Sequence, residues 1–224
     1  MPALSKRLET IASLVPFGAR VCDIGTDHGY LSIELMSRGD IKTVISTDIN
    51  EKPLQRAKEN IKRSGVEGID LRLCDGLLGI KEDEVDIAVI AGMGGEVIAS
   101  ILEKGDFVAK KVRLILQPTT SPEALRQFLY NNGYGVLNEI PLSENGKIYS
   151  VMVCSFEDKS YEPLNYQYFI GNVTPDTEDG YLYIKKQYDR CFECATALRN
   201  IPKKSEEFEF YNSVATALAD ILKI

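Results

Sequence analysis

Aspartates stand at the ends of three apolar, strand-like segments, and each lies beside a turn. The first segment runs into Asp23 to Tyr30 (DIGTDHGY), the second ends at Asp48, and the third ends at Asp75-Gly76. A carboxylate at the mouth of a turn repels phosphate and attracts cations. Glycine lets the backbone approach a ligand closely, because no Cβ intervenes. These residues predict a site for a ligand that carries a positive charge.

The glycine turn departs from the pattern that binds dinucleotides. A strand, a glycine turn and a helix form the first unit of doubly wound nucleotide-binding folds, in which G-x-G-x-x-G holds a pyrophosphate. Here Asp27 occupies the position of the middle glycine, and its charge would repel a pyrophosphate. It would instead attract an ammonium or sulfonium group, and S-adenosylmethionine carries both.

The acid of the second segment, Asp48, follows Gly25 by 23 residues. An acid at this spacing accepts hydrogen bonds from the ribose hydroxyls of an adenosine, in NAD or in S-adenosylmethionine. The alternative is that Asp48 only caps a helix that begins near Lys52-Pro53.

Two further glycine segments follow later strands. Asp75-Gly76 can hold an adenine amino group, or it can be an ordinary Asp-Gly turn. Gly92 to Gly95 follows an apolar strand and has little side-chain bulk. It can lie between a methyl donor and its acceptor, or it can be a tight connection from strand to helix.

The elements that position these residues follow from periodicity and turn signals. We expect helices at 3–15, 29–38, 51–64, 95–104 and 121–131, and strands at 20–24, 43–48, 69–74, 85–91, 112–116, 134–142 and 147–156. The last two strands form a hairpin through the turn at 143–146. A mostly parallel seven-stranded sheet with a late antiparallel hairpin is typical of an α/β, Rossmann-like class I methyltransferase. A dehydrogenase domain would more often add a parallel sixth strand.

The composition changes after residue 157, so we expect a catalytic domain at 1–157 and a second domain at 158–224. Two apolar stripes in the second domain recur at spacings of three and four, which predicts an antiparallel helical hairpin of coiled-coil type. The stripes are Tyr181, Ile184, Tyr188, Cys191, Ala195 and Leu198, and Phe208, Tyr211, Ala215, Leu218 and Leu222. They can serve only for packing, or the hairpin can also contact a substrate.

Composition limits the remaining possibilities. The 224 residues carry a net charge of −7, which argues mildly against a nucleic-acid partner, although a local patch is enough to contact phosphates. Cys191 and Cys194 form a C-x-x-C motif without a second ligand pair, so we expect no metal site. No apolar run reaches the ~20 residues of a membrane span, and no signal peptide is evident. We therefore expect a cytoplasmic, monomeric protein without membrane contact.

Several motifs taken together resemble a bacterial enzyme family. They are DIGTDHGYL (23–31), TDIN (47–50), CDGL (74–77), IAGMGG (90–95) and LQP (116–118). The chain resembles the tRNA (adenine-22-N1)-methyltransferases, which have a class I methyltransferase domain followed by a coiled-coil domain. The resemblance implies methyl transfer from S-adenosylmethionine to N1 of adenine 22 in the D arm of tRNA.

The resemblance also implies residue roles. Asp23, Gly25 and Asp27 would hold the amino-acid end of the cofactor, Asp48 and Ile49 its ribose, and Asp75 and Gly76 its adenine. Gly92, Met93 and Gly94 would lie beside the methyl group. Thr26, His28 and Ala91 complete the expected cofactor site, and Arg7, Tyr30, Met93 and Gly95 are expected to contact the substrate.

The expected chemistry needs few groups. Adenine N1 attacks the sulfonium carbon directly, so proximity and orientation dominate. Asp27 or His28 could accept a proton from the N6 amino group, with Tyr30 as a hydrogen-bonding or stacking partner, and the target base must leave its pair. Two other functions fit the sequence: a class I methyltransferase for a small molecule or protein, whose helical tail dimerises, and a binding module that retains S-adenosylmethionine. Deleting residues 160–224 is expected to spare cofactor binding and impair tRNA methylation.

Overall fold

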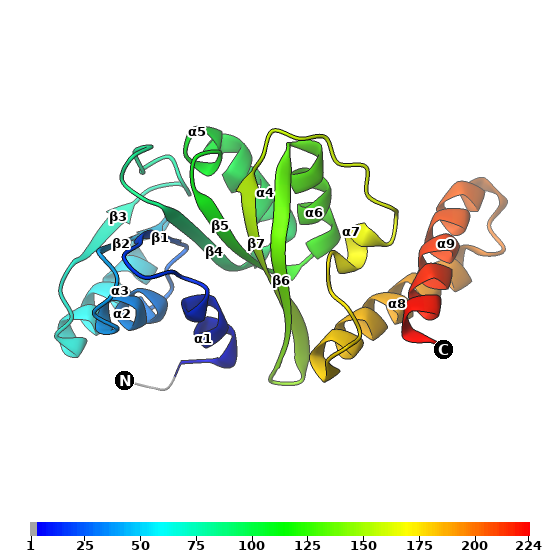
Figure 1. The fold of residues 1–224 in the computed structure, drawn as a ribbon, viewed down its shortest axis with the longest axis horizontal. Coiled ribbons are helices and arrows are strands. Elements are labelled where there is room, and N and C mark those ends of the chain that lie inside the picture. Colours follow the sequence, from blue (N-terminus) through cyan, green and yellow to red (C-terminus); the bar gives the residue numbers. More distant parts are fainter. Residues whose placement is uncertain (1–3) are drawn as a thin grey trace.

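The computed structural model describes residues 4–224, which form one seven-stranded sheet with helices on both faces (Figure 1). Residues 1–3, with which the first predicted domain and the predicted N-terminal helix begin, lie outside the described residues. The strand order is β3-β2-β1-β4-β5-β7-β6. β1 to β5 are parallel, whereas β7 is antiparallel to both β5 and β6. The sheet confirms the predicted α/β fold with a late antiparallel hairpin. The strands are β1 (Arg20–Ile24), β2 (Thr43–Asp48), β3 (Ile69–Leu73), β4 (Ile87–Gly94), β5 (Arg113–Thr120), β6 (Tyr134–Glu144) and β7 (Lys147–Phe156).

The helices begin and end at recognisable signals. The hydroxyl of Ser5 accepts the backbone N–H of Leu8 and caps the first helix, while Gly65 ends the third in a left-handed conformation (φ 71°). The helices are α1 (Lys6–Ser13), α2 (Tyr30–Ser37), α3 (Glu51–Ser64), α4 (Gly95–Lys104), α5 (Asp106–Ala109), α6 (Pro122–Asn131), α7 (Gln167–Ile170), α8 (Glu178–Leu198) and α9 (Ser205–Leu222), with a short 3-10 turn at Pro202–Lys204.

Two apolar clusters hold the sheet between its helices. Alternate residues of β1 point to opposite faces, as a strand requires: Val21 packs with α1 and α2, and Cys22 packs with α4, α5 and α6. Both side chains are fully buried. The central strands β1 and β4 are therefore covered on both faces, which fixes the positions of their carboxyl ends.

β4 and β5 run further than predicted. The predicted glycine loop at 92–95 begins inside β4, because Met93 pairs with Pro118 and Gly94 with Thr120. The register shifts on either side of Met93, and Gly92 has a φ of 83°. This bulge changes the direction of the last residues of β4. The apolar run that precedes it in the sequence does not reveal it. The four-residue helices α5 and α7 were not predicted, since so short a segment carries no helical periodicity.

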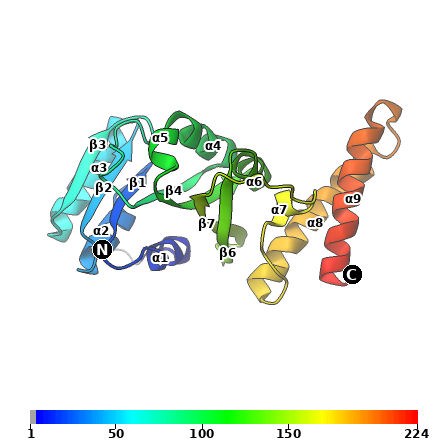
Figure 2. The same cartoon turned by 45° about the horizontal axis from the view of Figure 1, so that its top comes forward.

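The C-terminal helices form the predicted hairpin. α8 and α9 pack through buried residues that include Ile184, Cys191, Ala215 and Leu218, whereas Tyr181 of the predicted stripe is 38% exposed. The hairpin extends beyond the β6 edge of the sheet (Figure 2). The predicted division at residues 157 and 158 stays a prediction.

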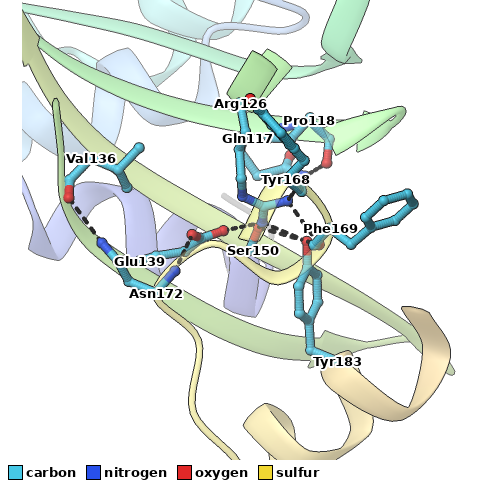
Figure 3. Close-up of polar contacts among 10 residues, drawn as sticks. All are labelled: Gln117, Pro118, Arg126, Val136, Glu139, Ser150, Tyr168, Phe169, Asn172 and Tyr183. Atoms are coloured by element: carbon cyan, nitrogen blue, oxygen red, sulfur yellow. Dashed lines mark hydrogen bonds and ion pairs between the residues drawn. The ribbon is translucent and has the colours of Figure 1, made fainter. Parts of the chain in front are cut away.

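A buried arginine joins this hairpin to the sheet (Figure 3). Arg126 of α6 is 0% exposed and forms an ion pair with Glu139 of β6. It also donates to the carbonyls of Tyr168 and Phe169, each at 2.9 Å, and to the hydroxyl of Tyr183 on α8 at 2.8 Å. Burial opposes the charge, but Glu139 beside it keeps the pKa of Arg126 above its ordinary value. We call these residues the Arg126 cluster.

Across residues 4–224, no helix is long and apolar enough to cross a membrane. The same part of the chain holds no group of three metal-ligating side chains. Cys191 and Cys194 are free thiols, and burial raises the pKa of Cys191 to about 12. The C-x-x-C motif thus has one cysteine in the packing seam of α8.

Candidate functional site

The predicted site residues converge at the carboxyl ends of β1, β2 and β4. β1 pairs with β2 on one side and with β4 on the other. The connection that follows β1 leads to β2, whereas the connection that follows β4 leads to β5, toward the opposite edge of the sheet. Ligands of open α/β sheets bind in the crevice outside such a switch point. Two adjoining cavities of about 370 and 380 Å³ open here, and Gly25, Asp48 and Met93 line both of them. We call the two together the groove.

Most of the predicted residues line the groove. They are Arg7, Asp23, Gly25, Thr26, Asp27, His28, Tyr30, Asp48, Ile49, Asp75, Gly76, Ala91, Gly92 and Met93. Gly94 and Gly95 do not line it. A Cβ on Gly95 would lie 2.1 Å from the carbonyl oxygen of Ser121, so this glycine permits close packing of α4 against the start of α6.

Asp23 is the buried acid of the groove. Its side chain accepts a hydrogen bond from Ser32 Oγ at 2.8 Å, and Ser32 Oγ lies 2.7 Å from Ser46 Oγ. Asp23 is only 6% exposed, and this burial raises the pKa of its carboxyl above the ordinary value. No cation among the described residues pairs with Asp23, so its oxygens are available to a positively charged ligand group. Neither serine belongs to a motif that could be recognised in the sequence.

The turn after β1 leaves space for a ligand. Thr26 is 2% exposed, and its hydroxyl, which lies near the Asp23 carboxyl, makes no hydrogen bond of good geometry among the described residues. Gly25 has a φ of 77°, and a Cβ there would lie 2.1 Å from the terminal methyl of Met93. An unpartnered buried hydroxyl and a glycine with a left-handed backbone in the turn are features of a polar ligand site.

The acids of β2 and of the turn after β3 lie further along the groove. Asp48 Oδ1 accepts the backbone N–H of Asn50 at 2.8 Å. Asn50, not Asp48, is the N-cap of α3, so the capping alternative is wrong, and Asp48 lines the groove. Asp75 accepts from Lys104 Nζ at 2.9 Å. Lys104 is a groove residue that the sequence analysis missed, since nothing in its spacing distinguishes it from other basic residues of α4.

Three predicted catalytic residues form one contact group. The His28 and Tyr30 rings stack with centroids 5.4 Å apart, and His28 Nε2 lies 3.4 Å from Asp27 Oδ1. Asn60 donates to the His28 carbonyl, which holds a left-handed backbone (φ 64°) in place. Asp27 is exposed and also lies 3.9 Å from Arg56. The arrangement offers an acid–imidazole pair and a flat aromatic surface at the mouth of the groove.

Gln117 is a functional candidate that the sequence analysis quoted only as part of a motif. It is fully buried within β5. Its Oε1 accepts the backbone N–H of Gly92 at 3.1 Å and Arg7 NH1 at 2.6 Å, while its Nε2 donates to the Pro118 carbonyl at 2.8 Å. These three bonds fix the amide and connect α1 to the groove. The available signal in the sequence was a glutamine directly after the predicted strand at 112–116.

A parallel sheet closed by an antiparallel hairpin, with acids around a groove at the β1/β4 switch point, defines a class I methyltransferase. Residues 4–152 match the family model described as methyltransferase domain. The chain is 42% identical over 158 residues to the tRNA (adenine(22)-N(1))-methyltransferase of Bacillus subtilis, a match over 70% of this chain and 66% of that relative. The chain belongs to the bacterial tRNA (adenine-22-N1)-methyltransferase family.

Solved structures resemble the whole chain. The B. subtilis m1A22 tRNA methyltransferase is 30% identical with a TM-score of 0.85, over 99% of this chain and 100% of that one. Streptococcus pneumoniae Sp1610, in complex with S-adenosyl-L-methionine, is 34% identical with a TM-score of 0.83, over 98% and 100%. The C-terminal hairpin is thus part of the shared fold.

Proposed function

We propose that this protein transfers a methyl group from S-adenosylmethionine to N1 of adenine 22 in tRNA. The observation that carries the proposal is the groove, which gathers Asp23, Asp48 and Asp75 at the ends of three neighbouring strands in a chain of this family. Acids in this pattern suit a cationic adenosyl ligand and disfavour a pyrophosphate. The matched relative carries the same activity in its name.

Different residues of the groove contact different parts of the cofactor. Bound S-adenosylmethionine supplies a methyl group on a sulfonium. Asp23 holds the ammonium of its amino-acid end, and the orphaned hydroxyl of Thr26 gains a partner there. Asp48 accepts from the ribose hydroxyls through the oxygen that Asn50 leaves free. Asp75 accepts a hydrogen bond from the adenine amino group. The Lys104 ammonium must then share the Asp75 carboxylate or move away from it.

The residues beside the groove position the acceptor. Tyr30 and His28 provide a stacking surface for a base that has left its pair. His28, oriented by Asp27, accepts a proton that the adenine N6 amino group releases as N1 gains the methyl. Arg7 lies beside Gly92 at the acceptor side of the groove. We further propose that residues 1–157 carry this chemistry and that 158–224 form a second domain in a monomeric enzyme.

Incubation with labelled S-adenosylmethionine and a tRNA transcript tests the proposal. We expect label in 1-methyladenosine after nuclease digestion, and no label in a transcript in which guanosine replaces adenosine 22. Label in the control transcript would contradict the assigned position. Label confined to protein or small metabolites would contradict the assigned substrate.

A further inference from the structure

A third cavity lies between the catalytic sheet and the C-terminal hairpin. It measures about 290 Å³ and is bounded by the connection from β5 to α6, by β7 and by α8. Its wall is shared with the groove: Thr119, which lines the cavity, donates its hydroxyl to the Met93 carbonyl at 3.0 Å, and Met93 lines the groove. We call this space the α8 cavity.

Cations gather at the rim of the α8 cavity. Lys186 and Arg190 lie on one side of α8 and both line it. Partial burial lowers the pKa of Lys186, and the positive charges of Arg190 and Lys147 lower it further against the opposing effect of Glu123. Lys186 and Arg190 are the charged side chains that line the cavity, and the one nearby carboxylate that pairs with either of them, Glu123, pairs with Arg190. This local excess stands out in a chain whose net charge is −7.

The interior of the cavity holds unused polar groups. Gln187 is 2% exposed, and its side-chain oxygen has no hydrogen-bond partner in the part of the chain that the structure describes. The side-chain amide of Gln187 can turn over, so either its oxygen or its nitrogen can face the cavity. Ser121, the N-cap of α6, makes no side-chain capping bond. The hydroxyl of Tyr183 belongs to the Arg126 cluster and accepts a hydrogen bond from Ser150 Oγ at 3.3 Å, which fixes the opposite wall (Figure 3).

We propose that the α8 cavity binds a backbone phosphodiester of the RNA substrate, a proposal that rests on the function proposed above. A phosphodiester is a monoanion with several acceptor oxygens, and the Lys186 ammonium and the Ser121 hydroxyl are suitable donors. The shared wall with the groove puts this contact on the same side of the molecule as the acceptor base. Phosphate contacts fix register and orientation of a nucleic acid.

The variant Lys186→Ala tests the contact. We expect the Kd for tRNA to rise about tenfold, and the slope of log Kd against log salt to fall by about one. The Kd for S-adenosylmethionine and the melting temperature should stay unchanged. Lys185→Ala is the matched control, because this neighbouring lysine pairs with Asp189 and does not line the cavity. Lys186→Arg should restore most of the affinity.

A second variant supplies an anion from the protein itself. Gln187→Glu puts a carboxylate beside Lys186 without a change of shape and should weaken tRNA binding at least as much. Its melting temperature is measured in parallel, because a buried carboxylate lowers stability. Wild-type tRNA affinity in both variants would overturn the proposal. A free nucleotide offers the same phosphate chemistry: if adenosine monophosphate raises the wild-type melting temperature while Lys186→Ala leaves tRNA affinity intact, the RNA assignment is wrong. If the wild-type protein does not methylate tRNA, the proposed function fails instead.

Discussion

Arg7 NH1 lies 2.6 Å from Gln117 Oε1, and the backbone N–H of Gly92 donates to the same oxygen at 3.1 Å. One buried amide thus joins the first helix to the backbone that borders the groove. The other side of Arg7 is held by Glu144 of β6, whose carboxylate also accepts the Arg7 backbone N–H at 2.9 Å. Gln117 of β5 and Glu144 of β6 therefore hold Arg7 in place.

This relationship predicts the effect of Gln117→Leu. The change removes the acceptor of both donors, so Arg7 and the Gly92 backbone lose their fixed positions. We expect kcat/KM for tRNA to fall by about a hundredfold, with a smaller change in the Kd for S-adenosylmethionine. Single-turnover kinetics and calorimetry separate the two. Arg7→Lys keeps the charge but not the planar fork and should show part of the same loss; wild-type kinetics in both variants would refute the positioning role.

Asp48→Ala should weaken cofactor binding. The ribose hydroxyls lose a charged acceptor, and the Kd for S-adenosylmethionine should rise about ten- to a hundredfold. Isothermal calorimetry measures this directly. Asp70→Ala is a suitable control, because Asp70 is an exposed acid on β3 that pairs with Arg72 outside the groove. Equal affinities for the wild-type protein and Asp48→Ala would remove the ribose role.

His28 and Asp27 are distinguishable by their substitutions. If His28 accepts the proton and Asp27 only orients it, His28→Gln should lower kcat about a hundredfold or more, and Asp27→Asn should lower it less. Single-turnover methylation rates at saturating tRNA and cofactor measure the difference between the two variants. The reverse order of effects would assign the proton transfer to Asp27.

The sequence predicted the regular elements because buried strands and amphipathic helices leave periodic patterns. It predicted the acids Asp23, Asp48 and Asp75, since each follows an apolar strand. It did not predict Gln117, Ser32 or Lys104, whose roles depend on side chains brought together from different elements. The bulge at Met93 was missed for a similar reason, because it arises from pairing with β5.

The Arg126 cluster changes the expected result of deleting residues 160–224. The sequence suggested an independent tail, but that deletion removes the Tyr168 and Phe169 carbonyls and the Tyr183 hydroxyl from a buried guanidinium. A buried charge without its partners is strongly destabilising. We therefore expect the truncated protein to lose stability as well as tRNA methylation, which makes point variants on α8 the better test.

Glu139→Gln measures the strength of this connection. It leaves the buried Arg126 without its carboxylate, and the free energy of unfolding should fall by about 3–5 kcal/mol. Chemical denaturation followed by circular dichroism provides the measurement. The double variant Arg126→Met/Glu139→Leu should be less destabilised than Glu139→Gln, because apolar replacement removes both charges together. A double variant as unstable as the sum of the single variants would contradict this account.

Asp23 predicts how cofactor affinity depends on pH. Burial raises the pKa of its carboxyl above the ordinary value of 3.8, so in the free protein Asp23 contributes stability below that value and loses the contribution as pH rises through the raised pKa. Binding of an ammonium requires the ionised form. The affinity for S-adenosylmethionine should therefore decrease as pH falls through the raised pKa, starting at a higher pH than an exposed aspartate would allow. Asp23→Asn should bind the cofactor more weakly at neutral pH and lose this part of the pH dependence. Calorimetric titrations of both proteins over a pH series test the prediction, and parallel pH profiles would show that Asp23 does not hold the charged end of the cofactor.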